Sequence, residues 1–285
     1  MTRERLPGLG DPPLPASPHA SHSALDAFDA SAQAWDEYTN TPLGRLRQEL
    51  TMHHLVQYLG SPAGSLDVLD VGGGTGSYAF PLARLGHRVC LLDFSAHMLA
   101  IARQKSQQLG PPLRERIDFC HASVVEIPGL FSSDRFDLIL CHTLLEYVLD
   151  PQEILDALAA VLRPGGLLSL LVANPHADPL RWAIARGDLQ KARLALDEPI
   201  STADLFGLPR RTFTAEAMQE AMAQAGMEVV ARYGVRIFAD HVPAEKLTDP
   251  EFFTRMLELE ISAGPLDPYR QIARYNQLLG RKLET

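Results

Sequence analysis

The sequence has few of the features that mark secreted, membrane-spanning or strongly nucleic-acid-binding proteins. Its three cysteines, Cys90, Cys120 and Cys141, are widely spaced in apolar runs, which excludes a disulfide framework and indicates a reducing cytosol. The longest apolar run, 167–173, is too short to span a bilayer. The formal net charge is -9, whereas binding of phosphates normally needs a basic surface. We therefore expect a soluble, cytoplasmic protein with no membrane partner.

The first 24 residues also lack the apolar segment that a secretion signal requires. They contain five prolines, and a segment of this composition buries too little apolar surface to order itself. We predict a disordered tail over 1–24 and a single domain over 25–285. A hydrophobic content of 46% is sufficient for the core of such a domain.

Strand-like and helical patterns alternate along most of this domain. Helical patterning at 25–60 is followed by short buried strands with helices between them, and Ser95 is placed to cap one of these helices. Another helix is expected to end at Pro164-Gly165-Gly166. Strands are predicted at 65–71, 87–93, 116–122, 134–143, 167–174, 227–238 and 272–282. This alternation predicts a doubly wound α/β fold, whose mostly parallel sheet binds ligands at the carboxyl ends of its strands.

Residues 175–212 interrupt this alternation. Their sequence is typical of helical and loop material without a strand. We predict that they form a helical lid insertion over the strand ends, which would shield a ligand from water.

Four glycines follow the first predicted strand within five positions, in the segment VLDVGGGTG. Each glycine costs ordering entropy, so a ligand is expected to approach the backbone closely there. The dinucleotide pattern G-x-G-x-x-G fails, because its third glycine, counted from Gly72, falls on Ser77. The pattern D-x-G-x-G-x-G fits from Asp70 through Gly74 to Gly76, and an acid there suits the cationic amino end of S-adenosylmethionine. An ordinary strand–helix turn is the alternative.

A second acid supports the cofactor interpretation. Asp93 ends the next predicted strand, 21 residues after Gly72, where acids of nucleoside-binding α/β folds hold ribose hydroxyls. A helix cap or a solvated charge is the alternative for this residue. Met98 is placed to pack on the adenine face, although it also fits the core.

These segments together resemble the class I S-adenosylmethionine-dependent methyltransferases. The resemblance covers residues 28–240 and is carried by VLDVGGGTG, LLDFSAHML, FDLILCHTLLEYVLDP and LRPGGLLSLLVAN. It implies a Rossmann-like, seven-stranded, mostly parallel sheet whose last strand, 272–282, is antiparallel. It also implies S-adenosylmethionine as the cofactor.

Within that superfamily the chain is most similar to the enzymes that methylate 5-carboxymethoxyuridine in the tRNA anticodon loop. The similarity is carried by TPLGRLRQ, by His142 together with LLEYVLDP, and by YGVRIFAD followed by LELE. It implies that Arg47 holds the cofactor carboxylate and that Gly72 and Gly73 face the amino-acid end. By the same similarity Asp93 would hold the ribose. Val124 and Val125 would border adenine, and His142 would line the pocket.

The sequence shows no catalytic base. It contains no compact Ser/His/Asp arrangement, no paired carboxylates at a convincing spacing and no metal-binding cluster. Because an ionised carboxylate needs no base to accept a methyl group, this absence is consistent with a carboxylate acceptor.

Arginines near the predicted lid are candidates for holding such an anion, because a guanidinium binds planar anions in bidentate geometry. Arg210, Arg211 and Arg236 are the candidates, with a solvated helix face as the alternative. The sequence thus predicts a methyltransferase acting on the carboxylate of a modified tRNA uridine. A small carboxylic acid or phenol is the alternative acceptor, and a non-catalytic cofactor-binding module is a third hypothesis.

Overall fold

The computed structural model describes residues 22–59, 64–197, 200–202 and 205–284. Residues 1–21 of the predicted disordered tail at 1–24 lie outside the described residues. Helix α1 (His22–Ala30) begins three residues before the predicted start of the domain at residue 25.

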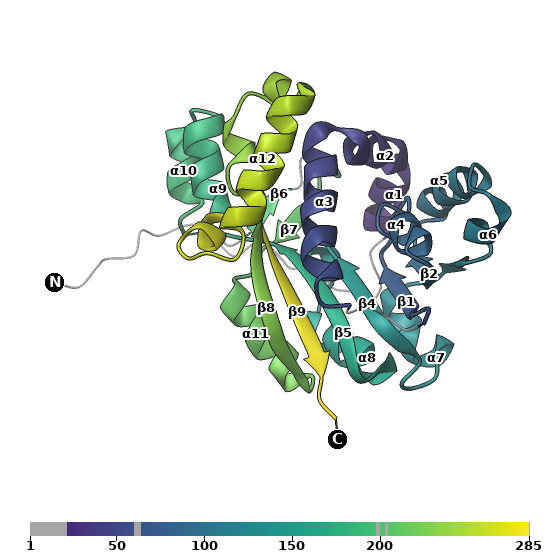
Figure 1. The fold of residues 1–285 in the computed structure, drawn as a ribbon. Coiled ribbons are helices and arrows are strands. Elements are labelled where there is room, and N and C mark those ends of the chain that lie inside the picture. The colour runs from purple at the N-terminus through teal and green to yellow at the C-terminus, as the bar shows by residue number, and fades with distance from the viewer. Residues whose placement is uncertain (1–21, 60–63, 198–199, 203–204, 285) are drawn as a thin grey trace.

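A seven-stranded sheet forms the centre of the molecule (Figure 1). Its strands are β1 (Asp67–Val71), β2 (Arg88–Asp93), β3 (Ile117–His121), β4 (Phe136–His142), β5 (Leu162–Ala173), β8 (Met227–Val235) and β9 (Tyr275–Lys282). Their order is β3-β2-β1-β4-β5-β9-β8. Strand β9 runs antiparallel to β5 and β8, whereas the pairs among β1 to β5 are parallel. The predicted mostly parallel sheet with an antiparallel last strand is confirmed.

Helices cover both faces of this sheet. On one face, Leu55, Leu82 and Leu99 belong to one buried cluster with strand residues such as Val68 and Leu138. On the other face, Ile127, Ile154 and Met218 belong to a second buried cluster with strand residues such as Leu69 and Ile139. The helices in these two layers are α3 (Pro42–Val56), α4 (Ala79–Arg84), α5 (Ala96–Gln107), α7 (Ile127–Leu130), α8 (Pro151–Val161) and α11 (Ala215–Gln224). Burial on both faces explains the continuous apolar character of the strands.

Further helices surround the two layers. They are α2 (Ala32–Asn40), α6 (Pro111–Arg114), α12 (Pro250–Ala263) and the 3-10 helices η1 (Val124–Glu126), η2 (Leu145–Tyr147), η4 (Ala239–His241), η5 (Ala244–Thr248) and η6 (Tyr269–Ile272). None of the helices in the described part of the chain is long and apolar enough to cross a membrane.

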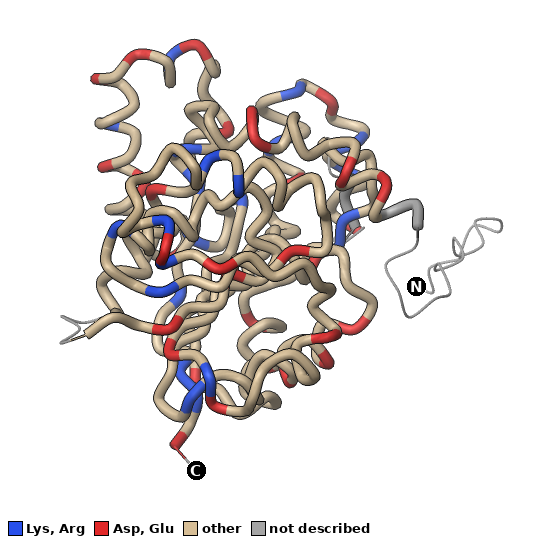
Figure 2. Tube along the Cα trace, turned by 90° about the vertical axis from the view of Figure 1, so that its right-hand side faces the viewer, with Lys and Arg blue, Asp and Glu red and all other residues tan. Residues whose placement is uncertain are grey.

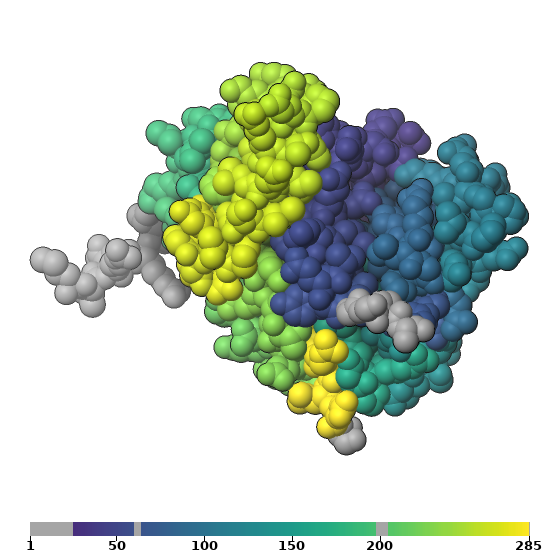
Figure 3. Space-filling view, in the orientation of Figure 1, coloured from purple at the N-terminus to yellow at the C-terminus, as the bar shows by residue number. Residues whose placement is uncertain are grey.

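The N-terminal helices are part of the body of the domain. Helix α3 packs against α12, and α2 packs against α5. In Figure 3 the purple N-terminal segment lies beside the yellow-green α12 over one face of the molecule. This packing brings residues that precede β1 to the sheet edge where β1 and β2 end.

Local capping follows the sequence at several helix starts. Ser95 Oγ accepts a hydrogen bond from the amide of Met98 at 3.1 Å, which confirms the predicted cap of α5. Thr41 Oγ1 accepts from the amide of Gly44 at 3.1 Å, and Pro42 occupies the first position of α3.

The boundary between α8 and β5 differs from the prediction. The helix does not continue to Pro164-Gly165-Gly166 but ends at Val161, and β5 already begins at Leu162. Leu162 is fully buried and is registered with Phe136 of β4, with an irregularity before the next pair. Pairing in the sheet therefore determines the conformation of this segment, rather than the local turn signal.

The predicted insertion at 175–212 is not free of strands. It contains α9 (Ala177–Leu180), the π-helical turn η3 (Arg181–Ala185), α10 (Leu189–Leu194) and the strands β6 (Ile200–Thr202) and β7 (Pro209–Arg211). Within the described part of the chain these two strands pair with each other, in an antiparallel two-stranded sheet. Three-residue strands are too short to show an alternating pattern, which is why the prediction of a strand-free insertion was wrong.

Candidate functional site

The loop after β1 has a backbone conformation that side-chain-bearing residues rarely adopt. The φ angles of Gly72, Gly74 and Gly76 are 66°, 54° and 88°. A Cβ atom on Gly72 would lie 2.6 Å from Leu144 Cδ1, and one on Gly74 would lie 3.2 Å from Trp35 Nε1. The glycines are therefore required both by backbone conformation and by close contacts.

Two buried carboxylates flank this loop. Asp70 lies in β1 and Asp93 ends β2, and their residues are 2% and 5% exposed. Asp93 accepts hydrogen bonds from the amides of Gly74 and Ser95, at 2.8 and 2.9 Å. Burial raises the pKa of Asp93 to about 6, and burial together with the charge of Asp93 raises the pKa of Asp70 to about 7. A Cβ on Gly73 would lie only 2.9 Å from Asp70 Oδ2. The pair favours a cation at the ends of β1 and β2.

Polar atoms without partners converge on the same region. Arg47 of α3 is 3% exposed, and its guanidinium lies 5.0 Å from the ring of Trp35 and 5.4 Å from that of Tyr38. Among the described residues, Arg47 Nε, Asp70 Oδ2 and His142 Nδ1 are buried without a hydrogen-bond partner. A buried cation and a buried acid in this state fit a ligand that carries both a carboxylate and an ammonium group, as the amino-acid end of S-adenosylmethionine does.

The residues predicted to border adenine are placed differently from one another. Met98 is buried, and its sulfur would lie 3.9 Å from a Cβ on Gly74. Val124 in η1 is also buried, whereas Val125 is 45% exposed. The structure therefore places Met98 beside the glycine loop. Of the two valines, Val124 is buried and Val125 is exposed.

A cluster of arginines surrounds Tyr275 at the start of β9. The guanidinium carbons of Arg47, Arg236 and Arg274 lie 5.8, 5.8 and 5.9 Å from the centre of the Tyr275 ring. Burial alone would raise the pKa of Tyr275, but the charges of Arg47, Arg236, Arg274 and Arg210 lower it to about 8. Arg47 therefore belongs both to this cluster and to the site beside the glycine loop.

Arg236 is held in the cluster by a strained backbone and by its own ion pair. Its φ angle is 62°, which is uncommon for a residue other than glycine. Its guanidinium donates to both carboxylate oxygens of Asp240, and it donates to the Tyr38 hydroxyl at 2.7 Å. The predicted residue thus lies at the site, with its orientation determined by two elements.

The two neighbouring arginines of β7 point in different directions. Arg210 is 6% exposed and pairs with the buried carboxylate of Glu146 at 3.7 Å. Arg211 is exposed and donates to the carbonyl oxygens of Val148 and Leu149, at 3.3 and 3.0 Å. The structure therefore brings Arg210 and Arg236 together and leaves Arg211 at the surface.

Several residues of the site were not identified from the sequence. Trp35 and Tyr38 come from α2, Leu144 follows β4, and Arg274 and Tyr275 lie at the start of β9. Arg274 is buried and donates to Asp178. Trp35 and Tyr38 could have been noticed as aromatic residues three positions apart in the helical segment FDASAQAWDEY. Nothing in the sequence around Arg274 and Tyr275 indicated more than a strand.

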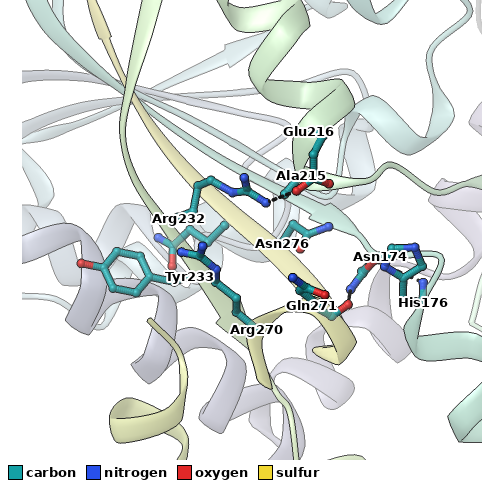
Figure 4. A pocket seen from close by; sticks show the side chains of 10 residues that line it. Asn174, His176, Ala215, Glu216, Arg232, Tyr233, Arg270, Gln271 and Asn276 are labelled. Carbon is teal, nitrogen blue, oxygen red and sulfur yellow. Dashed lines mark hydrogen bonds and ion pairs between the residues drawn. The ribbon is translucent and has the colours of Figure 1, made fainter. Parts of the chain in front are cut away.

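A hollow is lined by residues of α11, β8, η6 and β9 (Figure 4). Its volume is about 230 Å³. Arg232 donates to Glu216 across it, as the dashed line in Figure 4 shows. The neighbouring residues Asn276 and Gln277 of β9 both line it.

Comparison with known proteins shows the family to which this chain belongs. A family model described as "Methyltransferase domain" matches residues 69–170. The tRNA 5-carboxymethoxyuridine methyltransferase of Escherichia coli (strain K12) is 31% identical over 249 residues, which cover 85% of this chain and 90% of that protein. The ubiquinone biosynthesis O-methyltransferase of Xanthomonas axonopodis pv. citri is 33% identical over 57% of this chain and 65% of that protein.

Solved structures show the same fold. The 1,6-didemethyltoxoflavin-N1-methyltransferase of Burkholderia thailandensis, solved with bound 1,6-didemethyltoxoflavin and S-adenosylhomocysteine, has a TM-score of 0.58 at 21% identity, covering 96% of this chain and 94% of that one. A possible histamine N-methyltransferase of Thermotoga maritima also has a TM-score of 0.58, at 16% identity, covering 91% and 99%. The chain belongs to the class I S-adenosylmethionine-dependent methyltransferases and is related over most of its length to the tRNA 5-carboxymethoxyuridine methyltransferase.

Proposed function

We propose that this enzyme methylates a carboxylate, namely that of 5-carboxymethoxyuridine in tRNA. The observation that carries the proposal is the arginine cluster of Arg47, Arg236 and Arg274 around Tyr275, whose pKa Arg210 also helps to lower. Arg47 connects this cluster to the glycine loop through Trp35, which lies over Gly74. Guanidinium groups bind planar anions in bidentate geometry. Similarity to an enzyme named for this acceptor, over 85% of the chain, supports the same assignment.

In this proposal the cofactor binds against the loop after β1. Arg47 pairs with its carboxylate, Asp70 faces its ammonium group and Asp93 accepts from the ribose hydroxyls. The remaining proposed contacts are Gly72, Gly73 and Gly74 along the amino-acid end, Met98, Val124 and Val125 around adenine, and His142 in the pocket wall. The buried, unpartnered atoms of Arg47, Asp70 and His142 support this placement.

The chemistry requires alignment more than activation. S-adenosylmethionine supplies a methyl group on a positively charged sulfur, which makes that carbon electrophilic. The arginine cluster would hold the acceptor carboxylate ionised and oriented, so no residue has to remove a proton. Exclusion of water falls to the N-terminal helices, where Trp35 lies over Gly74.

A small carboxylic acid or phenol is the second candidate acceptor. Figure 2 shows Lys and Arg positions interspersed with Asp and Glu positions on the face in view, and the net charge is -9. Similarity to the ubiquinone biosynthesis O-methyltransferase over 57% of the chain also favours a small acceptor. A phenol would need a base, and Tyr275 is the candidate. Burial opposes ionisation of Tyr275, but the charges of the surrounding arginines lower its pKa to about 8.

The two acceptors are distinguished by incubation with methyl-labelled S-adenosylmethionine. One reaction contains tRNA from cells in which the gene for this protein is deleted, and the other contains a small-metabolite extract of the same cells. We expect label in tRNA, released by mild base as expected for a methyl ester. Activity should fall steeply with added salt. Binding of the protein releases counterions from the tRNA backbone, and a higher salt concentration opposes that release. Label confined to the extract would contradict the proposal, whether it is base-labile, as for a small carboxylic acid, or base-stable, as for a phenol.

Replacing Asp93 with Ala should weaken binding of S-adenosylhomocysteine by about 30- to 300-fold, because hydrogen bonds to two ribose hydroxyls and the support of Gly74 are lost together. Isothermal titration calorimetry measures this directly. Asp118→Ala, which removes an exposed carboxylate from the neighbouring strand β3, is the matched control and should leave the affinity unchanged. Equal affinities of the Asp93 variant and the unmodified protein would exclude the ribose assignment.

A further inference from the structure

A chain of buried polar side chains crosses the sheet from the candidate cofactor site to α3. His142 Nε2 lies 2.9 Å from Ser169 Oγ, Gln277 Nε2 donates to Ser169 Oγ at 3.4 Å, and Gln277 Oε1 lies 2.8 Å from His54 Nδ1. Ser169 and Gln277 have no exposed surface, and His54 is 1% exposed. Buried polar groups in the centre of a sheet are costly unless they are paired, so the orientation of each one is constrained by its neighbours.

The proton of His54 is located by the amide of Gln277. Gln277 Nε2 also donates to the backbone carbonyl of Thr51 at 3.0 Å. Turning the amide around would place its oxygen against that carbonyl, so the nitrogen faces Thr51 and Ser169 while the oxygen faces His54. Because this oxygen only accepts, His54 carries its proton on Nδ1. Burial lowers the pKa of His54 to about 4, so the ring is neutral at pH 7.

The proton of His142 follows from the same reasoning. Ser169 Oγ accepts from Gln277, and its own hydrogen has one acceptor among the described contacts, His142 Nε2. A neutral imidazole that accepts at Nε2 carries its proton on Nδ1. Burial, with a smaller effect of the charge on Arg47, lowers the pKa of His142 to about 3, which keeps the ring neutral.

His142 Nδ1 is buried and has no hydrogen-bond partner among the described residues. The ring lies 4.5 Å from that of Tyr78, at the end of β4. A buried N–H donor without an acceptor is unfavourable, so its presence beside Arg47 indicates that a ligand atom completes it.

We propose that Ser169 and Gln277 are positioning residues that hold His142 in the Nδ1–H tautomer, so that it donates a hydrogen bond to the cofactor carboxylate beside Arg47. The inference rests on the proposed cofactor site and is independent of the acceptor. A neutral donor adds directionality to the charge of Arg47 without adding a further buried cation.

The tautomer is measured by nuclear magnetic resonance on protein labelled with ¹⁵N-histidine, because the shifts of a protonated and an unprotonated ring nitrogen differ widely. We expect His142, assigned by its disappearance in His142→Gln, to carry its proton on Nδ1 at pH 7. In Ser169→Ala the acceptor nitrogen loses its donor, and the Nδ1–H signature should weaken or disappear. A proton on Nε2 in the unmodified protein would overturn the proposal.

Ligand binding separates positioning from a structural role. Ser169→Ala should weaken S-adenosylhomocysteine by about five- to thirtyfold, the range for a misdirected hydrogen bond to a charged group. It should change the affinity for 5′-methylthioadenosine, which lacks the amino-acid end, by less than twofold. Ser169→Thr retains the hydroxyl and should restore most of the difference between the two ligands.

The matched control is Ser106→Ala, which removes another buried serine hydroxyl, one that donates to the carbonyl of Arg103 within α5. It should leave both affinities unchanged. Equal losses for the two ligands in Ser169→Ala, or no loss for either, would overturn the proposal. Failure of the unmodified protein to bind S-adenosylhomocysteine would instead contradict the cofactor site itself.

Discussion

Replacing Asp70 with Asn is expected to stabilise the cofactor-free protein at pH 8 while greatly weakening its binding of S-adenosylmethionine. Burial and the charge of Asp93 raise the pKa of Asp70 from 3.8 to about 7. Because the pKa of Asp70 is higher in the folded protein than in the unfolded chain, the protonated side chain contributes its full stabilisation below about pH 4. This stabilisation is lost as the pH rises through 7. At pH 8 the ionised carboxylate is therefore a cost to folding, and an amide removes it.

Asp70→Asn should therefore increase the free energy of unfolding of the cofactor-free protein by about 1–4 kcal/mol at pH 8. The difference between Asp70→Asn and the unmodified protein should shrink toward pH 5, where the buried acid is already protonated. Denaturant titrations at the two pH values measure it. Binding should weaken by about 30- to 1,000-fold, because the cation of the cofactor loses a desolvated counter-charge.

Asp67→Asn is the matched control on the same strand. Although burial opposes the shift, hydrogen bonds and charges from Arg88 and Arg135 lower the pKa of Asp67. Its stabilising effect is therefore present above the pKa of the unfolded chain and is lost at low pH, the opposite of Asp70. The control should be slightly destabilised at pH 8 and should bind the cofactor normally. An Asp70 variant that is also destabilised, or that binds normally, would contradict the assignment.

Replacing Arg210 with Ala should reduce methyl transfer by about 100- to 1,000-fold, whereas Arg211→Ala should reduce it by less than threefold. Arg210 is buried beside Glu146 near Tyr275, and Arg211 is exposed on the opposite side of β7. The expected loss is that of one charge-assisted hydrogen bond to the acceptor, about 1.5–3 kcal/mol, together with poorer alignment. Initial rates with saturating labelled cofactor measure both variants.

The buried carboxylate of Glu146 would lose its ion pair in Arg210→Ala, and the variant could be destabilised for that reason alone. The double variant Arg210→Ala/Glu146→Gln removes the unpaired charge and keeps an acceptor for the amide of Ala173, which Glu146 Oε1 binds at 2.7 Å. It should fold and bind S-adenosylhomocysteine within threefold of normal while remaining slow. Arg210→Lys should rescue poorly, since an ammonium does not reproduce the guanidinium fork. Normal turnover in the double variant would place the acceptor elsewhere.

The parts of the site that lie close together in the sequence were predicted successfully as structure. The glycine loop does follow the first strand, Ser95 does cap α5, and Asp93 does end β2; the positive φ angles of Gly72, Gly74 and Gly76 are a finding of the structure. These features depend on backbone sterics and hydrogen bonds within a few residues, which a local pattern reflects. The sheet order follows because parallel strands joined by helices have few allowed arrangements.

Other features depend on the tertiary structure alone. The difference between Arg210 and Arg211 depends on how a three-residue strand is oriented over Glu146 of η2. The early start of β5 at Leu162 depends on pairing with Phe136. No local signal distinguishes these outcomes, because the deciding partner lies tens of residues away.

By itself, the sequence determined the α/β class, the glycine loop with its two acids and the methyltransferase family. Only the tertiary structure placed Tyr275 among arginines from four separate segments, Trp35 over Gly74, and Ser169 and Gln277 between two histidines. The physical reason is the antiparallel insertion of β9 between β5 and β8, which brings the end of the chain beside its middle. Contacts of that kind arise from strand order and burial, which a local sequence pattern does not contain.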